Sequence, residues 1–374
     1  MLNAYRGVKN DRAAVAPEFW YYYPAKVLGV DMIEFQRQVP FHEALKVTFE
    51  KHKCEGWGAA FAQVPNDLVK SKPEERWIDD NTLDVRTTII TPKGELMSKA
   101  RYSRLQPSWS MERPIKNIDR DLQAWELIAL GGDVTELDVG PMTKAWEYVG
   151  ESYLLEAWLG VPFFDLVAGA MDGGFAQGIF TFTDPGLETT LRRLQDAYTE
   201  RLVLLARTIC ENTPFESLCI GCSWSCNSLI SPDLWRRWDK PVVSAVCKEI
   251  HRHGKLLHIH FHGRCIDTVS DFAEMGIDCV CPFERPPGGD VAGIDGLREV
   301  ARALQGVTTM NGNVHTVETL IRGTPDDARR EVREILDSFK GNPRVIIGTG
   351  DQVGGETPIE NIEAMIDEAK RGHS

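Results

Sequence analysis

Short apolar runs with β character alternate with amphipathic helical stretches from about residue 135 onward, and this alternation constrains the fold more than any other feature. It is typical of a parallel sheet whose consecutive strands are connected by covering helices. Strands are predicted at residues 217–222, 256–262, 278–283, 308–313 and 345–349. Helices are predicted at residues 187–210, 232–253, 266–275, 325–339 and 358–369, where apolar residues recur at helical spacing. The pattern predicts an α/β protein of the (β/α)8 TIM barrel class.

The first 105 residues do not follow this pattern. They contain an aromatic cluster at residues 19–24, a helical stretch near residues 41–52, and alternating residues from 77 to 102 that turn at Pro92-Lys93-Gly94. Alternation interrupted by such a turn predicts an antiparallel β-hairpin. We therefore expect residues 1–105 to form an irregular N-terminal extension that contains a β-hairpin and packs on the barrel. Residues 106–374 are expected to form the (β/α)8 barrel catalytic domain.

Composition and charge exclude several classes of protein. The 374 residues suit one large α/β domain with an extension, and no run approaches the roughly 20 apolar residues that span a bilayer. The N-terminus lacks the basic-then-apolar plan of a secretory signal, so a cytoplasmic location with reduced thiols is expected. Nine cysteines without paired CxxC motifs favour neither a disulfide framework nor a four-thiolate zinc site. A net charge of -13 argues against nucleic acid and anionic membranes as partners.

One predicted strand carries three histidines at alternate positions, in the run Lys255-Leu-Leu-His-Ile-His-Phe-His-Gly263. Alternate residues of a strand share a face, so His258, His260 and His262 are expected to point the same way. Three imidazoles among apolar neighbours need either separate hydrogen-bond partners or one shared cation. Packed core histidines are the simpler interpretation for any one of them. For all three together, a metal site is the better interpretation.

Polar residues also close the other predicted strands, and in a barrel the carboxyl ends of the strands carry the chemistry. On this basis His260, His262 and Asp351 form the predicted metal site, with Glu284 as a fourth ligand or as the general acid/base. Glu284 paired with Arg285 or Arg264 is an open alternative, and so is Asp351 as a helix cap. The segment Cys222-Ser-Trp-Ser-Cys-Asn227 follows one strand, and Asn311 and Asn313 end another. Asn311 is expected to be a turn residue, whereas Asn313 is a candidate catalytic residue.

The chain resembles the uroporphyrinogen decarboxylase superfamily from about residue 120 to its end, and the most specific motifs lie in the last third. The residues that carry the resemblance are His260-Phe-His-Gly263, residues 273–278, Pro282-Phe-Glu-Arg-Pro-Pro-Gly-Gly-Asp290, Asn311-Gly-Asn313, and Gly348-Thr-Gly-Asp351 with the following Thr357-Pro358. This superfamily has a TIM barrel fold and includes decarboxylases and zinc-dependent, corrinoid-linked methyltransferases. Methyltransferases carry a His-x-Cys-Gly motif and a later cysteine seven residues before a proline. Here His262 and Asp351 stand where those two cysteines are expected.

The resemblance implies a zinc-dependent methyltransferase. A zinc ion held by two imidazoles and one carboxylate keeps net positive charge, which suits polarising an ether oxygen. We therefore expect an O-demethylase component that moves a methyl group from a methoxylated aromatic to the cobalt of cobalamin on a partner corrinoid protein. Glu284 is expected to protonate the leaving oxygen. Trp158, Trp224, Asn227 and His258 are the candidate substrate-binding residues, with core packing as the alternative for the tryptophans. A homodimer is compatible with the sequence.

Other functions stay open at this point. A methylcobamide-to-thiol methyltransferase keeps the fold, but the loss of both thiolates argues against it. A uroporphyrinogen decarboxylase-like activity is disfavoured because the Arg-rich N-terminal signature of that branch is absent before residue 76. A two-histidine, one-carboxylate ferrous site is normally built on another scaffold. The barrel as a non-catalytic corrinoid-binding or ligand-binding module is the alternative from a different class.

Overall fold

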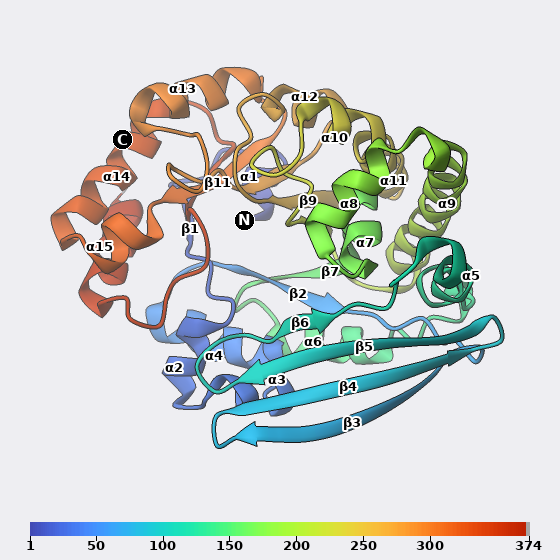
Figure 1. Cartoon of the computed structure of the whole chain (residues 1–374). Coiled ribbons are helices and arrows are strands. Elements are labelled where there is room, and N and C mark those ends of the chain that lie inside the picture. Colours follow the sequence, from blue (N-terminus) through green and yellow to red (C-terminus); the bar gives the residue numbers. More distant parts are fainter. Residues whose placement is uncertain (372–374) are drawn as a thin grey trace.

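The computed structural model describes residues 1–371, and its centre is an eight-stranded parallel sheet that curls inside a ring of helices (Figure 1). The strand order is β1-β12-β11-β10-β9-β8-β7-β2, and each neighbouring pair is parallel. The strands are β1 (Ala14–Ala16), β2 (Trp57–Phe61), β7 (Leu154–Gly160), β8 (Ser217–Cys222), β9 (Leu256–Phe261), β10 (Cys279–Pro282), β11 (Thr309–Val314) and β12 (Val345–Thr349).

The curled parallel sheet confirms a TIM-barrel-like fold. Within residues 1–371, no ladder of hydrogen bonds joins β1 to β2, so the sheet is an open half-barrel at that edge. All five strands predicted from the sequence are present at their expected positions, within one or two residues. The carboxyl ends of all eight strands therefore meet at one rim, where a barrel carries its chemistry.

The sheet does not begin after residue 105, contrary to the expected division of the chain. Strand β1 pairs with β12, and β2 pairs with β7, so two of the eight strands come from the expected extension. These strands are only three and five residues long, and such short apolar runs give a weak periodic signal. Strand β7 was not predicted either. Its inward-facing Glu156 interrupts the apolar run Leu154-Leu-Glu-Ala-Trp158.

Helices precede, connect and follow the strands. The predicted stretch 232–253 is two helices, because Pro241 cannot donate the backbone hydrogen bond that would continue the first. Among the described residues, no helix is long and apolar enough to cross a membrane. The α-helices are α1 (Leu2–Tyr5), α2 (Tyr22–Leu28), α3 (Met32–Gln38), α4 (Phe41–His52), α5 (Ile118–Ala129), α6 (Gly140–Val149), α7 (Phe163–Ala170), α8 (Gly174–Thr183), α9 (Glu188–Asn212), α10 (Pro232–Trp238), α11 (Lys240–Arg252), α12 (Val269–Met275), α13 (Gly293–Ala303), α14 (Pro325–Ser338) and α15 (Ile359–Arg371).

The predicted hairpin is present within a separate antiparallel sheet. Its strands are β3 (Lys70–Asp79), β4 (Thr82–Thr91), β5 (Gly94–Ser103) and β6 (Trp109–Glu112), in the order β3-β4-β5-β6. The turn between Thr91 and Gly94 closes the hairpin, as the sequence predicts. Figure 1 shows this sheet as long ribbons outside the parallel sheet.

The barrel interior changes from apolar to polar along the strands. At the amino ends of the strands, Tyr5 from α1 packs with Ala14, Leu256, Cys279 and Ile346 in a buried apolar cluster. This cluster closes one end of the barrel. Above it the interior holds polar side chains, among them Glu156 and His258, with Trp57 packed against them.

Far from that rim, an ion pair ties α11 to the start of β10 and makes stability depend on pH. The Nε2 atom of His251 lies 2.8 Å from Asp278 Oδ2, and the hydrogen bond to this carboxylate raises the pKa of His251 to about 10. A histidine with a raised pKa contributes stability below its unfolded pKa of about 6.5, and that contribution disappears as the pH rises through the folded value.

We expect His251→Gln to lose about 1 kcal/mol of unfolding free energy at pH 6, since the pair is partly exposed and screened. The difference between wild type and variant should shrink between pH 6.5 and about 10. Urea unfolding at pH 6, 8 and 10 measures this difference in unfolding free energy. A difference that stays constant across this range would show that the charge of His251 does not act on Asp278.

Candidate metal centre

Three imidazoles follow one another along β9 and its carboxyl end. His258 and His260 are buried on the inner side of the strand, and His262 follows the strand directly. The Nε2 atoms of His260 and His262 lie 2.6 Å apart. Their rings are nearly perpendicular, at 85°. Two of the three histidines therefore direct the same ring nitrogen at one point.

The loop after β10 orients His262. Its Nδ1 atom lies 2.9 Å from Glu284 Oε1, and the backbone N–H of Gly263 donates to the same oxygen at 2.8 Å. Because a carboxylate accepts, Nδ1 carries a proton, and Nε2 is the nitrogen that can bind a metal ion or a second proton. Gly263 has a φ of +70°, and a Cβ there would lie 2.4 Å from Ser228 Oγ, so the backbone after the histidine favours glycine.

A cysteine from β10 and two tryptophans surround His260. The Nδ1 atom of His260 lies 3.0 Å from Cys281 Sγ. Burial raises the pKa of the Cys281 thiol to about 12, so the sulfur keeps its proton. Trp20 lies nearly parallel to the imidazole, with ring centroids 6.2 Å apart, and Trp57 packs against it at 5.6 Å. This enclosure leaves Nε2 as the nitrogen of His260 that faces the other polar groups.

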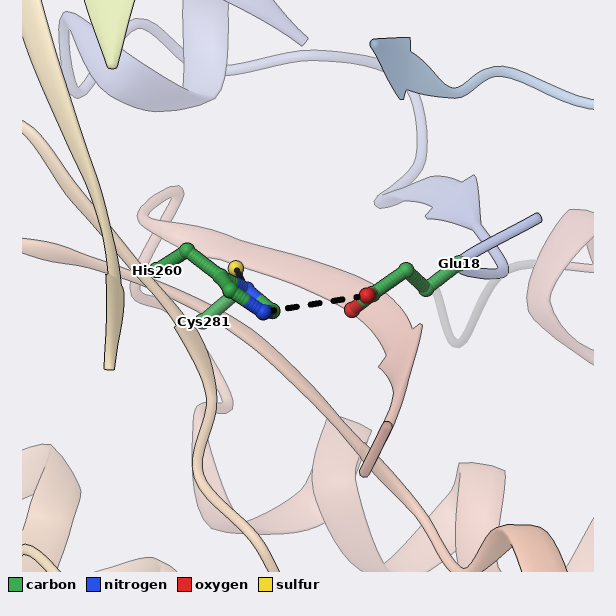
Figure 2. A group of neighbouring side chains, drawn as sticks. All are labelled: Glu18, His260 and Cys281. Atoms are coloured by element: carbon green, nitrogen blue, oxygen red, sulfur yellow. Dashed lines mark hydrogen bonds and ion pairs between the residues drawn. The ribbon is translucent and has the colours of Figure 1, made fainter. Parts of the chain in front are cut away.

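Glu18 reaches the same nitrogen from the loop after β1. Its Oε1 atom lies 3.8 Å from His260 Nε2, and Figure 2 shows the carboxylate directed at the imidazole, with Cys281 beside the ring. One ligand atom each from Glu18, His260 and Cys281 lie within 4.8 Å of one another. The backbone N–H of Glu18 donates to Thr349 Oγ1 of β12 at 3.0 Å, which fixes the loop. Burial and the nearby charge of Asp351 raise the pKa of Glu18 to about 8.

The electrostatics of this cluster favour a bound cation. Burial, and then the neighbouring His262, lower the pKa of His260, so His260 is neutral. Burial also opposes protonation of His262, but the hydrogen bond to Glu284 and the charges of Asp351 and Glu18 raise its pKa to about 9. Two facing Nε2 atoms at 2.6 Å need a cation between them, which is a proton on His262 in the absence of metal or one shared metal ion in its place. Imidazole nitrogens with a carboxylate oxygen and a nearby thiol are the donors that zinc takes in proteins.

The structure places the predicted ligands and catalytic residues as follows. His260 and His262 converge, while Asp351 contributes its charge to Glu18 and His262 and accepts the N–H of Gln352 at 2.6 Å.

Glu284 pairs with His262, and the alternatives that pair it with Arg285 or Arg264 are wrong, because those arginines contact other acids. Asn313 is wholly buried and donates to Phe283 O at 2.9 Å, so it supports the segment that carries Glu284.

The four predicted substrate-binding residues do not share one position. Trp158 lies in the barrel over Gly221, where a Cβ would be 2.3 Å from its ring, and Gly221 is aligned with His260. Trp224 instead contacts Arg113, with the guanidinium 4.9 Å from the indole. Asn227 holds its own loop through Ile230 O and the hydroxyl of Thr268. His258 is wholly buried with both ring nitrogens partnered, which places it beneath the cluster and corrects its assignment as a substrate contact.

Glu18, Cys281 and Glu156 belong to this region and were not selected from the sequence. Glu18 follows the apolar run Ala13-Ala-Val-Ala16, so it closes a strand in the way that Glu284 does. Its segment was assigned to the extension, which hid the signal. Cys281 lies at an alternate position of a predicted strand, but buried cysteines are ordinarily core residues. Glu156 lies on β7, the strand that was not predicted.

Comparisons with known proteins agree with part of this description. Residues 188–372 match the family model for uroporphyrinogen decarboxylase. A uroporphyrinogen decarboxylase from Thermus thermophilus is 29% identical over 185 residues, which are 49% of this chain and 49% of that protein. The enzyme of the same name from Syntrophotalea carbinolica is 27% identical over 184 residues, which are 48% of each. The chain thus spans about half the length of the curated relatives it matches.

A solved structure matches over nearly the whole chain. A methyltransferase from Methanosarcina mazei has a TM-score of 0.62 and 16% sequence identity, over 99% of this chain and 97% of that one. At this identity the match shows a shared fold. The family match begins at α9 and includes β8 to β12, so it contains His260, His262 and Glu284 but neither Glu18 nor Glu156. The C-terminal half of the chain is therefore similar to the uroporphyrinogen decarboxylase family, within a fold that the whole chain shares with a methyltransferase.

Proposed function

We propose that this protein is a zinc-dependent methyltransferase that moves a methyl group from a methoxylated aromatic to the cobalt of a corrinoid carried by a partner protein. The observation that carries the proposal is the convergence of His260 Nε2 and His262 Nε2, 2.6 Å apart beside Glu18 at the carboxyl end of the barrel. The fold shared with a methyltransferase supports the reaction class.

The residues present fit a zinc ion. His260 and His262 would hold it through Nε2, with Glu18 as the carboxylate ligand. Asp351 lies close enough for its charge to act on Glu18 and His262. Bound there, zinc supplies a Lewis acid for the oxygen of the methyl donor. Two neutral imidazoles and one carboxylate leave a divalent ion with net positive charge, which suits an oxygen that becomes negative as the methyl group leaves.

The chain's own groups position the donor. Trp20 lies beside His260, and Trp158 covers Gly221 on the neighbouring strand, so flat apolar surfaces adjoin the cluster, while the buried Trp57 supports His260 from behind. An aromatic ether matches such walls. The methyl carbon then bonds to reduced cobalt, the bond to oxygen breaks with its electron pair on oxygen, and the phenolate takes a proton from water. Glu284 orients His262 in this scheme, in place of the acid role expected from the sequence.

The same geometry disfavours decarboxylation of a porphyrinogen. The acid groups of such a substrate need cationic partners, whereas this cluster gathers Glu18, Asp351 and Glu284 around two imidazoles. A thiol acceptor is disfavoured as well, because the two positions that carry thiolates in the thiol-linked enzymes are His262 and Asp351 here.

The test is methyl transfer by the zinc-loaded full chain. We expect aryl methyl ethers with cob(I)alamin to yield methylcobalamin, followed by absorbance, and an equal amount of the phenol, followed by chromatography. Methylcobalamin with a simple thiol should yield little methyl thioether. Methylation of the thiol without activity on ethers would move the protein to the thiol-linked class. Release of carbon dioxide from a porphyrinogen would contradict methyl transfer altogether.

A further inference from the structure

A continuous chain of hydrogen-bonding groups runs beneath the candidate metal centre through the barrel interior. From the bottom, Ser217 Oγ donates to Glu156 Oε1 at 2.6 Å, and Glu156 Oε2 lies 2.7 Å from His258 Nδ1. His258 Nε2 then lies 3.1 Å from Cys281 Sγ, which lies 3.0 Å from His260 Nδ1. The chain connects four different strands, β7, β8, β9 and β10.

Every link of this chain is enclosed by protein. Glu156, Ser217 and His258 are wholly buried, and Cys281 is 2% exposed. Trp57 packs edge-on against His258, with ring centroids 4.6 Å apart. A buried carboxylate is costly unless donors satisfy both of its oxygens, and Ser217 and His258 do so here.

The carboxylate of Glu156, at the lower end of these hydrogen bonds, sets which group donates at each step. Glu156 accepts hydrogen bonds, so His258 donates through Nδ1, and in the neutral ring the Nε2 lone pair faces Cys281 Sγ. The Cys281 thiol can then donate S–H to His258, which leaves its sulfur to accept from above. His260 is left to donate through Nδ1 to that sulfur, and its Nε2 lone pair faces His262. The carboxylate at the bottom thus selects the tautomer of the imidazole at the top.

Glu284 does the same for His262 from the opposite side. Two buried or half-buried carboxylates therefore hold two imidazoles so that both present Nε2 to one point. Partners of this kind behind metal-bound histidines commonly affect metal affinity by about 10-fold to 100-fold. The connection from Glu156 differs from that of Glu284, because His258 and Cys281 lie between its carboxylate and His260.

We infer that Glu156, His258 and Cys281 are positioning residues of the metal centre, which fix the tautomer and orientation of His260 while Cys281 remains a thiol outside the coordination sphere. This inference rests on the proposed function, since it requires that a metal ion binds His260. It assigns a role to the buried strand β7 that the sequence did not reveal. It also separates Cys281 from the metal ligands, although its sulfur lies near them.

The experiment measures zinc affinity of the full chain by competition with a chromophoric chelator, using zinc salt alone. Cys281→Ala interrupts the chain and should weaken zinc binding about 10-fold to 100-fold. Cys281→Ser restores a group that donates and accepts, so its affinity should stay within about fivefold of wild type. Glu156→Gln keeps an acceptor oxygen without charge, and should weaken binding by about threefold to tenfold. The matched control is Cys210→Ala, which removes a buried thiol from α9, outside the sheet that carries the metal centre.

The cobalt-substituted wild type gives a second readout that needs no variant. We expect its spectrum to lack the intense near-ultraviolet band of a thiolate bound to Co(II). A strong band that disappears in Cys281→Ser would show that Cys281 is a ligand, and would overturn the positioning role. Equal zinc affinity in wild type and Cys281→Ala would overturn it too, while leaving the proposed function intact. A wild type that binds neither zinc nor cobalt would contradict the proposed function itself.

Discussion

Replacing His260 with alanine should remove tightly bound zinc and lower methyl transfer by about three orders of magnitude. A Lewis acid stabilises the leaving oxygen by several kcal/mol, and each 1.4 kcal/mol is about a factor of ten in rate. His260 is 8% exposed and lies between Glu18 and His262, so its removal takes away the central donor of the cluster. Metal analysis of the purified variant and the rate of methylcobalamin formation measure both effects.

The matched control for His260→Ala is His52→Ala. His52 is also buried, but its ring contacts Phe19 and the hydroxyl of Tyr23, away from the convergent nitrogens. The control should lose stability and keep zinc. If His260→Ala kept both its zinc and its activity, the metal would have to bind elsewhere, and the proposed centre would be wrong.

Replacing Glu284 with alanine should weaken zinc binding about 10-fold to 100-fold and lower activity in parallel. Its Oε1 atom serves two donors, the Nδ1–H of His262 and the N–H of Gly263. Without that oxygen the imidazole is free to change tautomer or rotate, and a partly buried N–H loses its partner at a cost of about 1–3 kcal/mol in stability. Zinc competition and urea unfolding measure the two losses separately.

Asp290→Ala provides the comparison for Glu284→Ala. Asp290 lies on the same loop and accepts the backbone N–H groups of Cys265 and Ile266, at 2.9 and 3.4 Å. It should show a similar loss of stability without a loss of zinc affinity. A Glu284→Ala protein that binds zinc as tightly as wild type but turns over slowly would support the general acid role instead of the orienting one.

Much of the barrel could be predicted from the sequence, because long amphipathic helices and buried strands give strong periodic signals. Strands β8 and β12 begin and end where the pattern of apolar residues predicts. The first two strands could not be found in this way. Strand β1 has only three residues, and its place beside β12 is fixed by pairing with a partner about 330 residues later in the chain. Such distant pairing leaves no trace in local periodicity.

The residues of the candidate site also differ in whether local periodicity could identify them. His260 and His262 could be selected because alternation on one strand fixes their common face. Glu18, Cys281 and Glu156 could not, since each comes from a different segment of the chain. Strand pairing sets Cys281 beside His260, and the curl of the sheet brings Glu18 and Glu156 to His260 and His258. His258 shows the limit of the alternation rule. The rule places it on the correct face, but depth in the barrel makes it a partner of Glu156 and not a surface for substrate.

The most direct test is an anomalous difference map at the zinc edge, from crystals of the full chain grown with zinc. The account predicts one peak bonded to Nε2 of His260 and Nε2 of His262 at about 2.0–2.1 Å. The two nitrogens should then stand about 3.3 Å apart, as tetrahedral coordination requires, in place of the 2.6 Å seen here. A map without a peak at this position, in which the two nitrogens still share a hydrogen bond, would contradict the metal centre.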